Sequence, residues 1–266
     1  ARNSVFFNNR SNIPFQDVEE SFFTNELHTT DTIAVADFDK DGDVDLLTGN
    51  IRVPFKLYYN NSKATSFTGV KRTQAGNASA TNTFAALAVD IDNDGDLDII
   101  NGRNSTSVPN HIIFNNGTDA PFDSAVKQNI SNDNLRTRGM AAGDIDNDGD
   151  VDIVSANNAQ GLYVHINDGV DPFFEPGSGQ AFGSMSAAWD VALADLNRDG
   201  WLDVVAVSMS NTQENRVFIN NKTGTPFSGG SNLFTGTSTY ETSSVATGDV
   251  DNDGDIDVFI STIGVT

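Results

Sequence analysis

The hydrophobic residues of this chain occur in short runs separated by segments rich in Gly, Asn, Ser and Pro. Thr32–Ala36 alternates apolar with small or polar residues, and Val44–Leu47 and Lys56–Tyr59 are shorter, mainly apolar runs. A weaker run lies near Phe67–Val70. Such alternation, punctuated by turn residues, is typical of β-strands, and no segment carries a sustained helical period. We therefore predict an all-β protein built of short antiparallel strands.

An internal repeat organises these strands. One acidic stretch recurs with starts that are 53, 54, 51 and 54 residues apart, at Asp37, Asp90, Asp144, Asp195 and Asp249. A hydrophobic run ending in Asn, such as VFFNN from Val5, and then a Phe that usually follows Pro recur in the same order. Four short strands in each unit of about 53 residues are typical of a β-propeller blade.

The two ends of the chain fall at complementary points of the repeat. The chain starts at a third-strand run, Val5–Asn8, and stops just after a second strand, Val258–Ser261. We therefore predict one domain, residues 1–266, of five four-stranded blades, because pairing the ends would remove exposed sheet edges. In that ring, Val5–Asn8 is the third strand beside Ser244–Gly248 and Ile256–Ile260. The alternative is that the repeats are part of a larger ring.

The spacing within the acidic stretch is that of a metal-binding loop. Oxygen ligands at positions 1, 3 and 5 can turn toward one centre, and glycine at position 6 permits the sharp turn. Position 7 can add its backbone carbonyl and position 9 a further carboxylate, which suits Ca²⁺ better than Mg²⁺ or a softer metal. An EF-hand is excluded because it requires Glu at position 12, where the chain has Thr48, Asn101, Ser155, Ala206 and Ile260. The alternative is a solvated acidic turn.

The sequence thus predicts about five Ca²⁺ ions. The predicted ligand positions are Asp37, Asp39, Asp41, Asp43 and Asp45; Asp90, Asp92, Asp94, Asp96 and Asp98; Asp144, Asp146, Asp148, Asp150 and Asp152; Asp195, Asn197, Asp199, Trp201 and Asp203; and Asp249, Asp251, Asp253, Asp255 and Asp257. The seventh residue of each loop is included for its backbone carbonyl only. The fourth loop has lost a carboxylate at Asn197 and gained a cation at Arg198, so we expect the weakest affinity there.

With its D-x-D/N-x-D-G-x-x-D loops, the chain resembles the FG-GAP/VCBS repeat family, which includes the propellers of integrin α-subunits. The resemblance covers nearly the whole chain and implies a secreted or cell-surface, calcium-stabilised β-propeller. Two departures are visible. Such propellers usually have seven blades, and the Phe-Gly and Gly-Ala-Pro words of the family name are not clearly present.

Composition narrows the possible partners. The formal net charge is -22 and the pI about 4.1, which disfavours nucleic acid and anionic membranes as partners. No apolar run approaches the roughly 20 residues that span a bilayer, so no membrane insertion is expected. The chain has no cysteine, which excludes disulfides and thiol catalysis. Glycosylation is left open by seven N-x-S/T sequons, at Asn9, Asn60, Asn77, Asn104, Asn116, Asn129 and Asn221.

A ligand site is expected at the rim opposite the metal loops, in the segments that precede each loop. Six positions ahead of the loops lie Asp31, Phe84, Arg138, Trp189 and Ser243, and Tyr240 lies nearby. The residue type at these positions differs between repeats, whereas the loops repeat nearly the same sequence. Such variation on a constant scaffold is expected of a binding face. The alternative is that they are ordinary loop and channel residues.

Two classes of function follow. The first is a non-catalytic binding or adhesion module, lectin-like or protein-binding, with a protein or glycan ligand at this rim. The second is a lyase-type enzyme acting on polysaccharides, because some family members resemble polysaccharide lyases built on such propellers. The three histidines, His28, His111 and His165, form no evident catalytic set. A structural subunit of an extracellular assembly is a third possibility.

Overall fold

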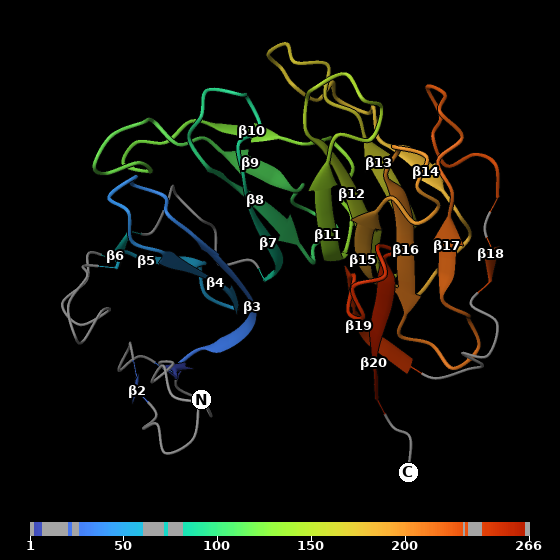
Figure 1. Cartoon of the computed structure of the whole chain (residues 1–266). Helices are drawn as coiled ribbons and strands as arrows, with labels where there is room; N and C mark the ends of the chain where they lie inside the picture. Colours follow the sequence, from blue (N-terminus) through green and yellow to red (C-terminus); the bar gives the residue numbers. More distant parts are fainter. Residues whose placement is uncertain are drawn as a thin grey trace.

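The computed structural model describes residues 3–6, 21–22, 27–60, 72–73, 82–230, 232–233 and 241–263. Strands, turns and loops make up these residues, which confirms the all-β prediction (Figure 1). None of the described segments is a helix long and apolar enough to span a membrane. The predicted strand near Phe67–Val70 lies outside the described residues.

The strands form four four-stranded antiparallel sheets. The first contains β3 (Thr29–Ala36), β4 (Asp45–Ile51), β5 (Lys56–Tyr58) and β6 (Arg72–Thr73), and the second β7 (Thr83–Val89), β8 (Asp98–Arg103), β9 (His111–Ile113) and β10 (Lys127–Asn129). The third contains β11 (Thr137–Gly143), β12 (Asp152–Asn157), β13 (Gly161–His165) and β14 (Gln180–Phe182), and the fourth β15 (Ala188–Ala194), β16 (Asp203–Ser208), β17 (Arg216–Phe218) and β18 (Asn232–Leu233). Two two-stranded sheets complete the fold: β1 (Ser4–Val5) with β2 (Ser21–Phe22), and β19 (Glu241–Gly248) with β20 (Asp257–Ile263).

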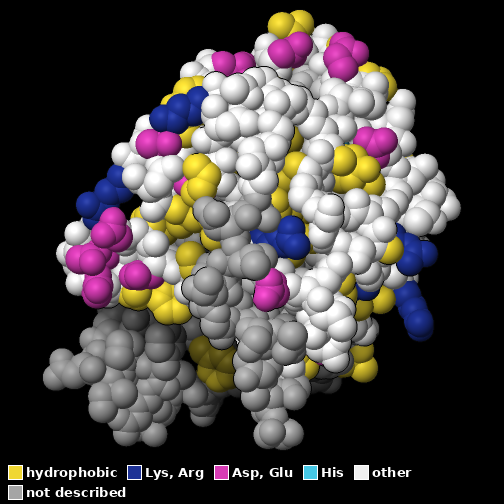
Figure 2. Space-filling view, turned by 90° about the vertical axis from the view of Figure 1, so that its right-hand side faces the viewer, with side chains coloured by type: hydrophobic (Ala, Val, Ile, Leu, Met, Phe, Trp, Pro, Cys, Tyr) yellow, Lys and Arg dark blue, Asp and Glu magenta, His cyan; other side chains and the backbone are white. Residues whose placement is uncertain are grey.

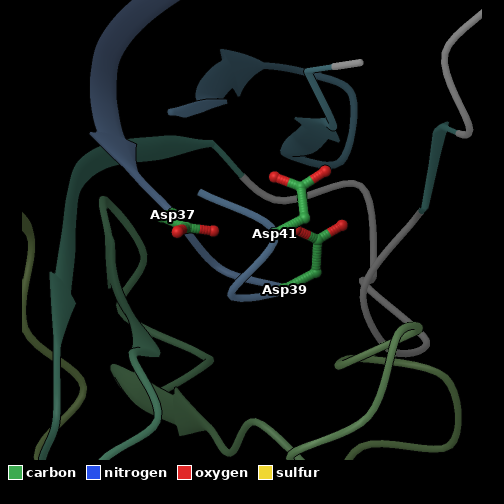
Figure 3. A group of neighbouring side chains, drawn as sticks. All are labelled: Asp37, Asp39 and Asp41. Atoms are coloured by element: carbon green, nitrogen blue, oxygen red, sulfur yellow. The ribbon is translucent and has the colours of Figure 1, made fainter. Parts of the chain in front are cut away.

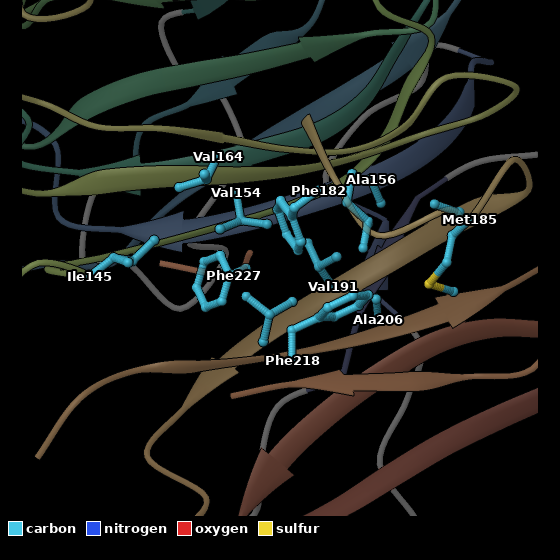
Figure 4. Close-up of a cluster of buried hydrophobic side chains, with 13 residues drawn as sticks. Ile145, Val154, Ala156, Val164, Phe182, Met185, Val191, Ala206, Phe218 and Phe227 are labelled. Atoms are coloured by element: carbon cyan, nitrogen blue, oxygen red, sulfur yellow. The ribbon is translucent and has the colours of Figure 1, made fainter. Parts of the chain in front are cut away.

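The sheets stand face to face, and their first strands, β3, β7, β11, β15 and β19, lie side by side in chain order. A separate hydrophobic core fills each space between neighbouring four-stranded sheets. Between the third and fourth sheets, Val154 and Val164 pack against Val191 and Phe218 (Figure 4). The second strand of each inner sheet is buried along its whole length, because both of its faces meet a neighbouring sheet.

The predicted closure at five blades is wrong for the described residues: there are four four-stranded sheets, and the two terminal pairs do not join. The described strand β1 pairs with β2, and β19 pairs with β20. Val5 packs on Leu46 and Tyr58 of the first sheet, and Asn3 Nδ2 donates to Thr30 Oγ1 at 2.8 Å. The rest of the predicted strand, beyond Phe6, lies outside the described residues.

The side chains at the two ends show where the arc is open. Ile33 is 63% exposed, while its counterparts in the next three sheets, Ala86, Met140 and Val191, are buried. Phe259 is 49% exposed, while its counterparts on the second strands of the four complete sheets are fully buried. The phase of the termini could not predict this, because a two-residue strand such as β1 offers few ladder hydrogen bonds to offset the entropy of closing the ring.

Candidate metal loops and central cavity

The five acidic loops connect the first strand to the second in each sheet and share one backbone shape. Their fourth residues, Lys40, Asn93, Asn147, Arg198 and Asn252, are left-handed with φ between 57° and 60°. Their glycines, from Gly42 to Gly254, have φ between 84° and 98°, which is strained for any residue with a side chain. In each loop the glycine N–H donates to the first aspartate at 2.8–3.1 Å. The fourth loop keeps this shape despite its altered sequence.

Four of these loops gather three carboxylates within 4.8 Å of one another. The groups are Asp37, Asp39 and Asp41 (Figure 3); Asp90, Asp92 and Asp94; Asp144, Asp146 and Asp152; and Asp249, Asp251 and Asp257. The ninth loop residue thus takes part in the third and fifth loops, as Asp152 and Asp257. The predicted ligands outside these groups are Asp43, Asp45, Asp96, Asp98, Asp148, Asp150, Asp253 and Asp255, together with all five positions of the fourth loop.

Oxygens of these groups are buried without a donor. Asp37 Oδ1, Asp39 Oδ1, Asp90 Oδ1 and Asp146 Oδ1 have no hydrogen-bond partner. Burial, together with neighbouring carboxylates, raises the pKa of Asp39, Asp92 and Asp146. A buried oxygen that only accepts requires either a donor or a cation. The gathered carboxylates therefore fit a hard cation such as Ca²⁺.

The ninth loop residue also supports the fold. Asp45, Asp98, Asp152 and Asp203 are buried at the start of the second strands. In Asp98, for example, Oδ2 accepts from the Ile91 N–H at 3.1 Å and Oδ1 from the Asn115 N–H at 2.8 Å. Burial raises the pKa of Asp98 to about 7 and these backbone donors oppose the shift; the pKa of Asp152 is raised to about 7 and that of Asp45 to about 6.

Side chains at the fourth loop position link each loop to the next, a role that the sequence analysis missed. Lys40 Nζ lies 2.6 Å from Asp96 Oδ1, and Asn93 Nδ2 donates to Asp150 Oδ1 at 2.7 Å. Asn147 instead donates to the Gly200 carbonyl at 3.2 Å, because Trp201 replaces the seventh-position carboxylate in the fourth loop. The recurrence of a polar fourth residue and an acidic seventh residue was the available signal.

Arg198 follows the same rule, which changes our interpretation of the fourth loop. Its Nε lies 2.6 Å from Asp255 Oδ1 of the fifth loop. The cation beside the fourth loop's own carboxylate is Lys222, whose Nζ lies 3.2 Å from Asp199 Oδ2. Asn197 turns its amide oxygen to the Asp199 N–H at 2.9 Å. Competition for this loop's ligands therefore comes from Lys222 rather than from Arg198.

In the second, third and fourth sheets, the Asn after the third strand joins neighbouring sheets. Asn115 Nδ2 donates to the Phe38 carbonyl at 2.9 Å, across to the preceding metal loop. Asn167 and Asn220 make the equivalent bonds to the Ile91 and Ile145 carbonyls at 3.0 and 2.9 Å. All three side chains are buried. The repeated Asn therefore holds the second residue of the previous loop in place.

The predicted rim residues meet in one cavity. The pairing register of every first strand shifts at a β-bulge, between Thr30 and Thr32, Thr83 and Ala85, Thr137 and Gly139, Ala188 and Asp190, and Thr242 and Ser244. The residues at these bulges are Asp31, Phe84, Arg138, Trp189 and Ser243, and all five line a cavity of about 480 Å³. Bulges aim side chains in this way beside binding sites. Tyr240 lies outside the described residues.

The cavity and the metal loops lie at opposite ends of the first strands, because the bulges fall near each strand's start and the loops follow its end. The described cavity lining contains no His or Tyr. His111 and His165 are buried within the second and third sheets. Burial lowers the pKa of His165 to about 4, and burial together with Arg103 and Lys127 lowers the pKa of His111 to about 3.

Together these features define a class: repeat proteins of small antiparallel sheets, each with an acidic loop between its first two strands. The chain belongs to the FG-GAP-like repeat family, whose model matches residues 37–101, 90–155, 144–206 and 195–260. The match identifies four repeats of this family. It does not identify an integrin-like calcium site.

Among solved structures, the chain is similar to the V. cholerae biofilm matrix protein Bap1, with 18% identity and a TM-score of 0.47 over 88% of this chain and 35% of that one. It is also similar to BBS1N in complex with ARL6DN, with 12% identity and a TM-score of 0.44 over 89% of this chain and 76% of that one. The chain therefore spans about a third of the length of the Bap1 chain. No curated protein matches it.

Proposed function

We propose that this chain is a calcium-stabilised, propeller-type binding module of an extracellular protein, with a protein or glycan ligand in the central cavity. The observation that carries this proposal is the convergence of five bulge residues on one cavity of about 480 Å³. A cavity of that size, with a few polar groups aimed into it, is typical of a small-ligand or sugar site. The bulge residues differ between sheets, so the cavity has one particular chemistry on a repeated scaffold.

The metal loops support calcium as the stabilising ion. Their side-chain oxygens come from the first, third, fifth and ninth positions, with Asn197 in place of an aspartate in the fourth loop. In each loop a bound Ca²⁺ would offset part of the carboxylate charge and stiffen the turn. Like-charge repulsion then becomes attraction, and the free energy of binding adds to the free energy of folding.

An extracellular location is consistent with this chemistry. Extracellular calcium modules bind the ion with dissociation constants of roughly 10⁻⁴–10⁻³ M, so exposed loops of modest affinity are filled only where calcium is abundant. Several loop residues, including Asp41, Asp94 and Asp253, are exposed. The family membership favours the same location.

A second candidate is a structural subunit of an extracellular assembly. The exposed Ile33 and Phe259 at the two ends of the arc favour this candidate, because their counterparts elsewhere are covered by a neighbouring sheet. No observation favours the lyase-type alternative, since the described cavity lining offers Arg138 and Asp31 but no Tyr or His to act as base.

Glycan and protein arrays probed with the calcium-loaded chain test the binding proposal. We expect a retained ligand whose binding is lost in Trp189→Ala and kept in Val126→Ala, an exposed position outside the described cavity lining. Binding that survives Trp189→Ala would place the ligand elsewhere. Steady release of unsaturated products from an acidic polysaccharide would instead indicate an enzyme.

A further inference from the structure

Arg138 lines the cavity and lies against two aromatic rings. Its guanidinium carbon lies 4.1 Å from the centre of the Phe84 ring and 4.2 Å from the centre of the Trp189 ring. These two rings come from the neighbouring sheets on either side, so the guanidinium is held between them. A guanidinium stacked on aromatic rings keeps its five N–H donors free at its edges, where they match the geometry of a carboxylate.

The structure does not supply a full set of partners for these donors. Arg138 Nε is buried without a hydrogen-bond partner, and no ion pair joins Arg138 to a carboxylate of the described residues. Burial lowers the pKa of Arg138, the charge of Asp31 opposes this shift, and the charge of Arg136 adds to it. A cation held in a partly desolvated place without a paired anion is costly, and a bound anion would offset that cost.

Besides Asp31, the cavity lining contains the carboxylate of Asp190, which already accepts hydrogen bonds from other residues. Asp190 Oδ2 accepts from Ser244 Oγ and from the Val245 N–H, both at 3.0 Å, and Asp190 Oδ1 accepts from the Val191 N–H at 3.0 Å. Asp190 therefore joins the fourth sheet to β19 and cannot turn to Arg138 without losing these bonds. Arg138 lines the cavity together with the polar residues Thr32 and Ser243.

Resting on the proposed binding function, we infer that the cavity binds a single anionic sugar residue, with its acidic group held by Arg138 and its hydroxyls by the neighbouring polar side chains. The carboxylate of a uronic acid fits the forked donors of a guanidinium in a bidentate manner. The net charge of -22 would repel an extended polyanion along the surface. A terminal or isolated acidic residue entering the cavity avoids most of that repulsion.

Isothermal titration of the calcium-loaded chain with short oligosaccharides tests this inference. The probes are a uronic-acid disaccharide, the same disaccharide with its carboxylate reduced to an alcohol, a sulfated disaccharide, and sodium sulfate alone. We expect the uronic-acid disaccharide to bind at least about tenfold more tightly than its reduced form. The sulfated probes then distinguish a carboxylate-specific site from a general anion site.

Two variants locate the contact. Arg138→Gln should weaken binding of the uronic-acid disaccharide by about 10- to 100-fold. The exposed neighbour Arg136, changed to Gln, removes the same charge two residues away and should leave binding unchanged. The emission of Trp189, isolated in a Trp201→Phe background, should shift on binding in the parent and not in Arg138→Gln. Unfolding curves of both Gln variants verify that they fold.

Equal affinity for the acidic and reduced disaccharides would overturn the anion inference and leave the binding function standing, provided Trp189 still responds. The inference also fails if Arg136→Gln weakens binding as much as Arg138→Gln does, because the loss of any nearby positive charge would then explain the weaker binding. If no sugar or array ligand changes the Trp189 emission, both the inference and the proposed function of the cavity are wrong.

Discussion

At the scale of single residues, burial decides which titratable groups are available for function. His165 lies inside the third sheet, with its ring centre 6.3 Å from that of Tyr163 and 6.5 Å from that of Phe174. Both ring nitrogens are buried without a partner. His165 is therefore a core residue, and it contributes to pH-dependent stability rather than to chemistry.

We expect His165 to make the protein less stable in acid. Burial lowers its pKa to about 4, with the Asp133 carboxylate opposing the shift, whereas the ordinary value is 6.5. The neutral ring is favoured in the folded state. The contribution of His165 to the free energy of unfolding is therefore fully present above pH 6.5 and is lost as the pH falls toward 4. Between pH 7.5 and pH 5 the loss is about 2 kcal/mol.

Urea unfolding of His165→Phe measures this contribution. The variant removes the titrating group and fills a similar volume, so it should lose about 2 kcal/mol less than the parent chain between the two pH values. Identical pH dependence in both chains would show that His165 is protonated or solvated in the folded state.

At the scale of elements, the bulged first strands both pack the sheets and present the cavity side chains. Gly139 follows the bulge of β11 and lies against β15. A Cβ built there would lie 2.6 Å from Asp190 Cα and 2.9 Å from the Trp189 carbonyl oxygen. The absence of a side chain at Gly139 therefore lets the third and fourth sheets approach closely at the cavity.

Gly139→Ala should destabilise the protein by about 1–3 kcal/mol, because the added Cβ would meet backbone atoms of β15, which cannot move aside as a flexible side chain would. Gly224→Ala is the matched control, since nothing lies within 4 Å of its added Cβ and its φ is not in the left-handed region. Thermal unfolding of the two variants should show a loss for Gly139→Ala alone. A similar melting temperature for both would mean that β11 and β15 can separate freely.

At the scale of the whole molecule, stability and self-association depend on the negative charge and on the exposed hydrophobic side chains at the two ends of the arc. Acidic side chains outnumber basic ones by 37 to 15, and 23 of the 37 fall in the five loops. On the face shown in Figure 2, hydrophobic side chains reach the surface between charged ones. The folded state therefore requires cations that reduce the repulsion among its carboxylates. The exposed hydrophobic side chains at its two ends favour contact with another apolar surface.

Removal of metal should lower the melting temperature. An excess of chelator restores the repulsion among the gathered carboxylates, and added Ca²⁺ should reverse the change. Differential scanning calorimetry with and without chelator measures the shift. An unchanged melting curve in chelator would exclude a stabilising ion.

A pair of variants assigns the effect to the loop ligands. Asp94 belongs to a gathered group and Asp43 does not. Asp94→Ala should therefore reduce the calcium-induced rise in melting temperature more than Asp43→Ala does. If the two variants respond equally to calcium, position 5 is not a ligand.

The open ends should cause weak self-association. Phe259 and Ile33 would be covered by a neighbouring sheet anywhere else in the fold. Sedimentation velocity over a range of concentrations should show association that decreases in Phe259→Ser, while Val126→Ser, at another exposed hydrophobic position, has no effect. Unaltered association in Phe259→Ser would show that this end is shielded in solution.

Much of the local structure could be predicted from the sequence. The strands before and after each acidic loop and the glycine at the turn are encoded within the loop and its immediate flanks, where spacing alone constrains the backbone. The repeat period follows from the recurrence of that loop along the chain. The bulge residues could be identified by their fixed distance from the loops. The links from the fourth loop residue to the next loop were equally regular, but their partners lie in the next repeat, so the recurring polar fourth and acidic seventh residues indicate a contact only when repeats are compared.

Only the tertiary structure decided what these local units build. Phe84, Arg138 and Trp189 lie in three different sheets, and their stacking depends on how those sheets pack. The pairing of the described terminal strands, β1 with β2 and β19 with β20, is likewise a property of the folded chain rather than of the repeat phase. Local sequence determines the shape of one repeat, whereas the cavity and the open ends arise from the sum of several packing interfaces, which no single segment encodes.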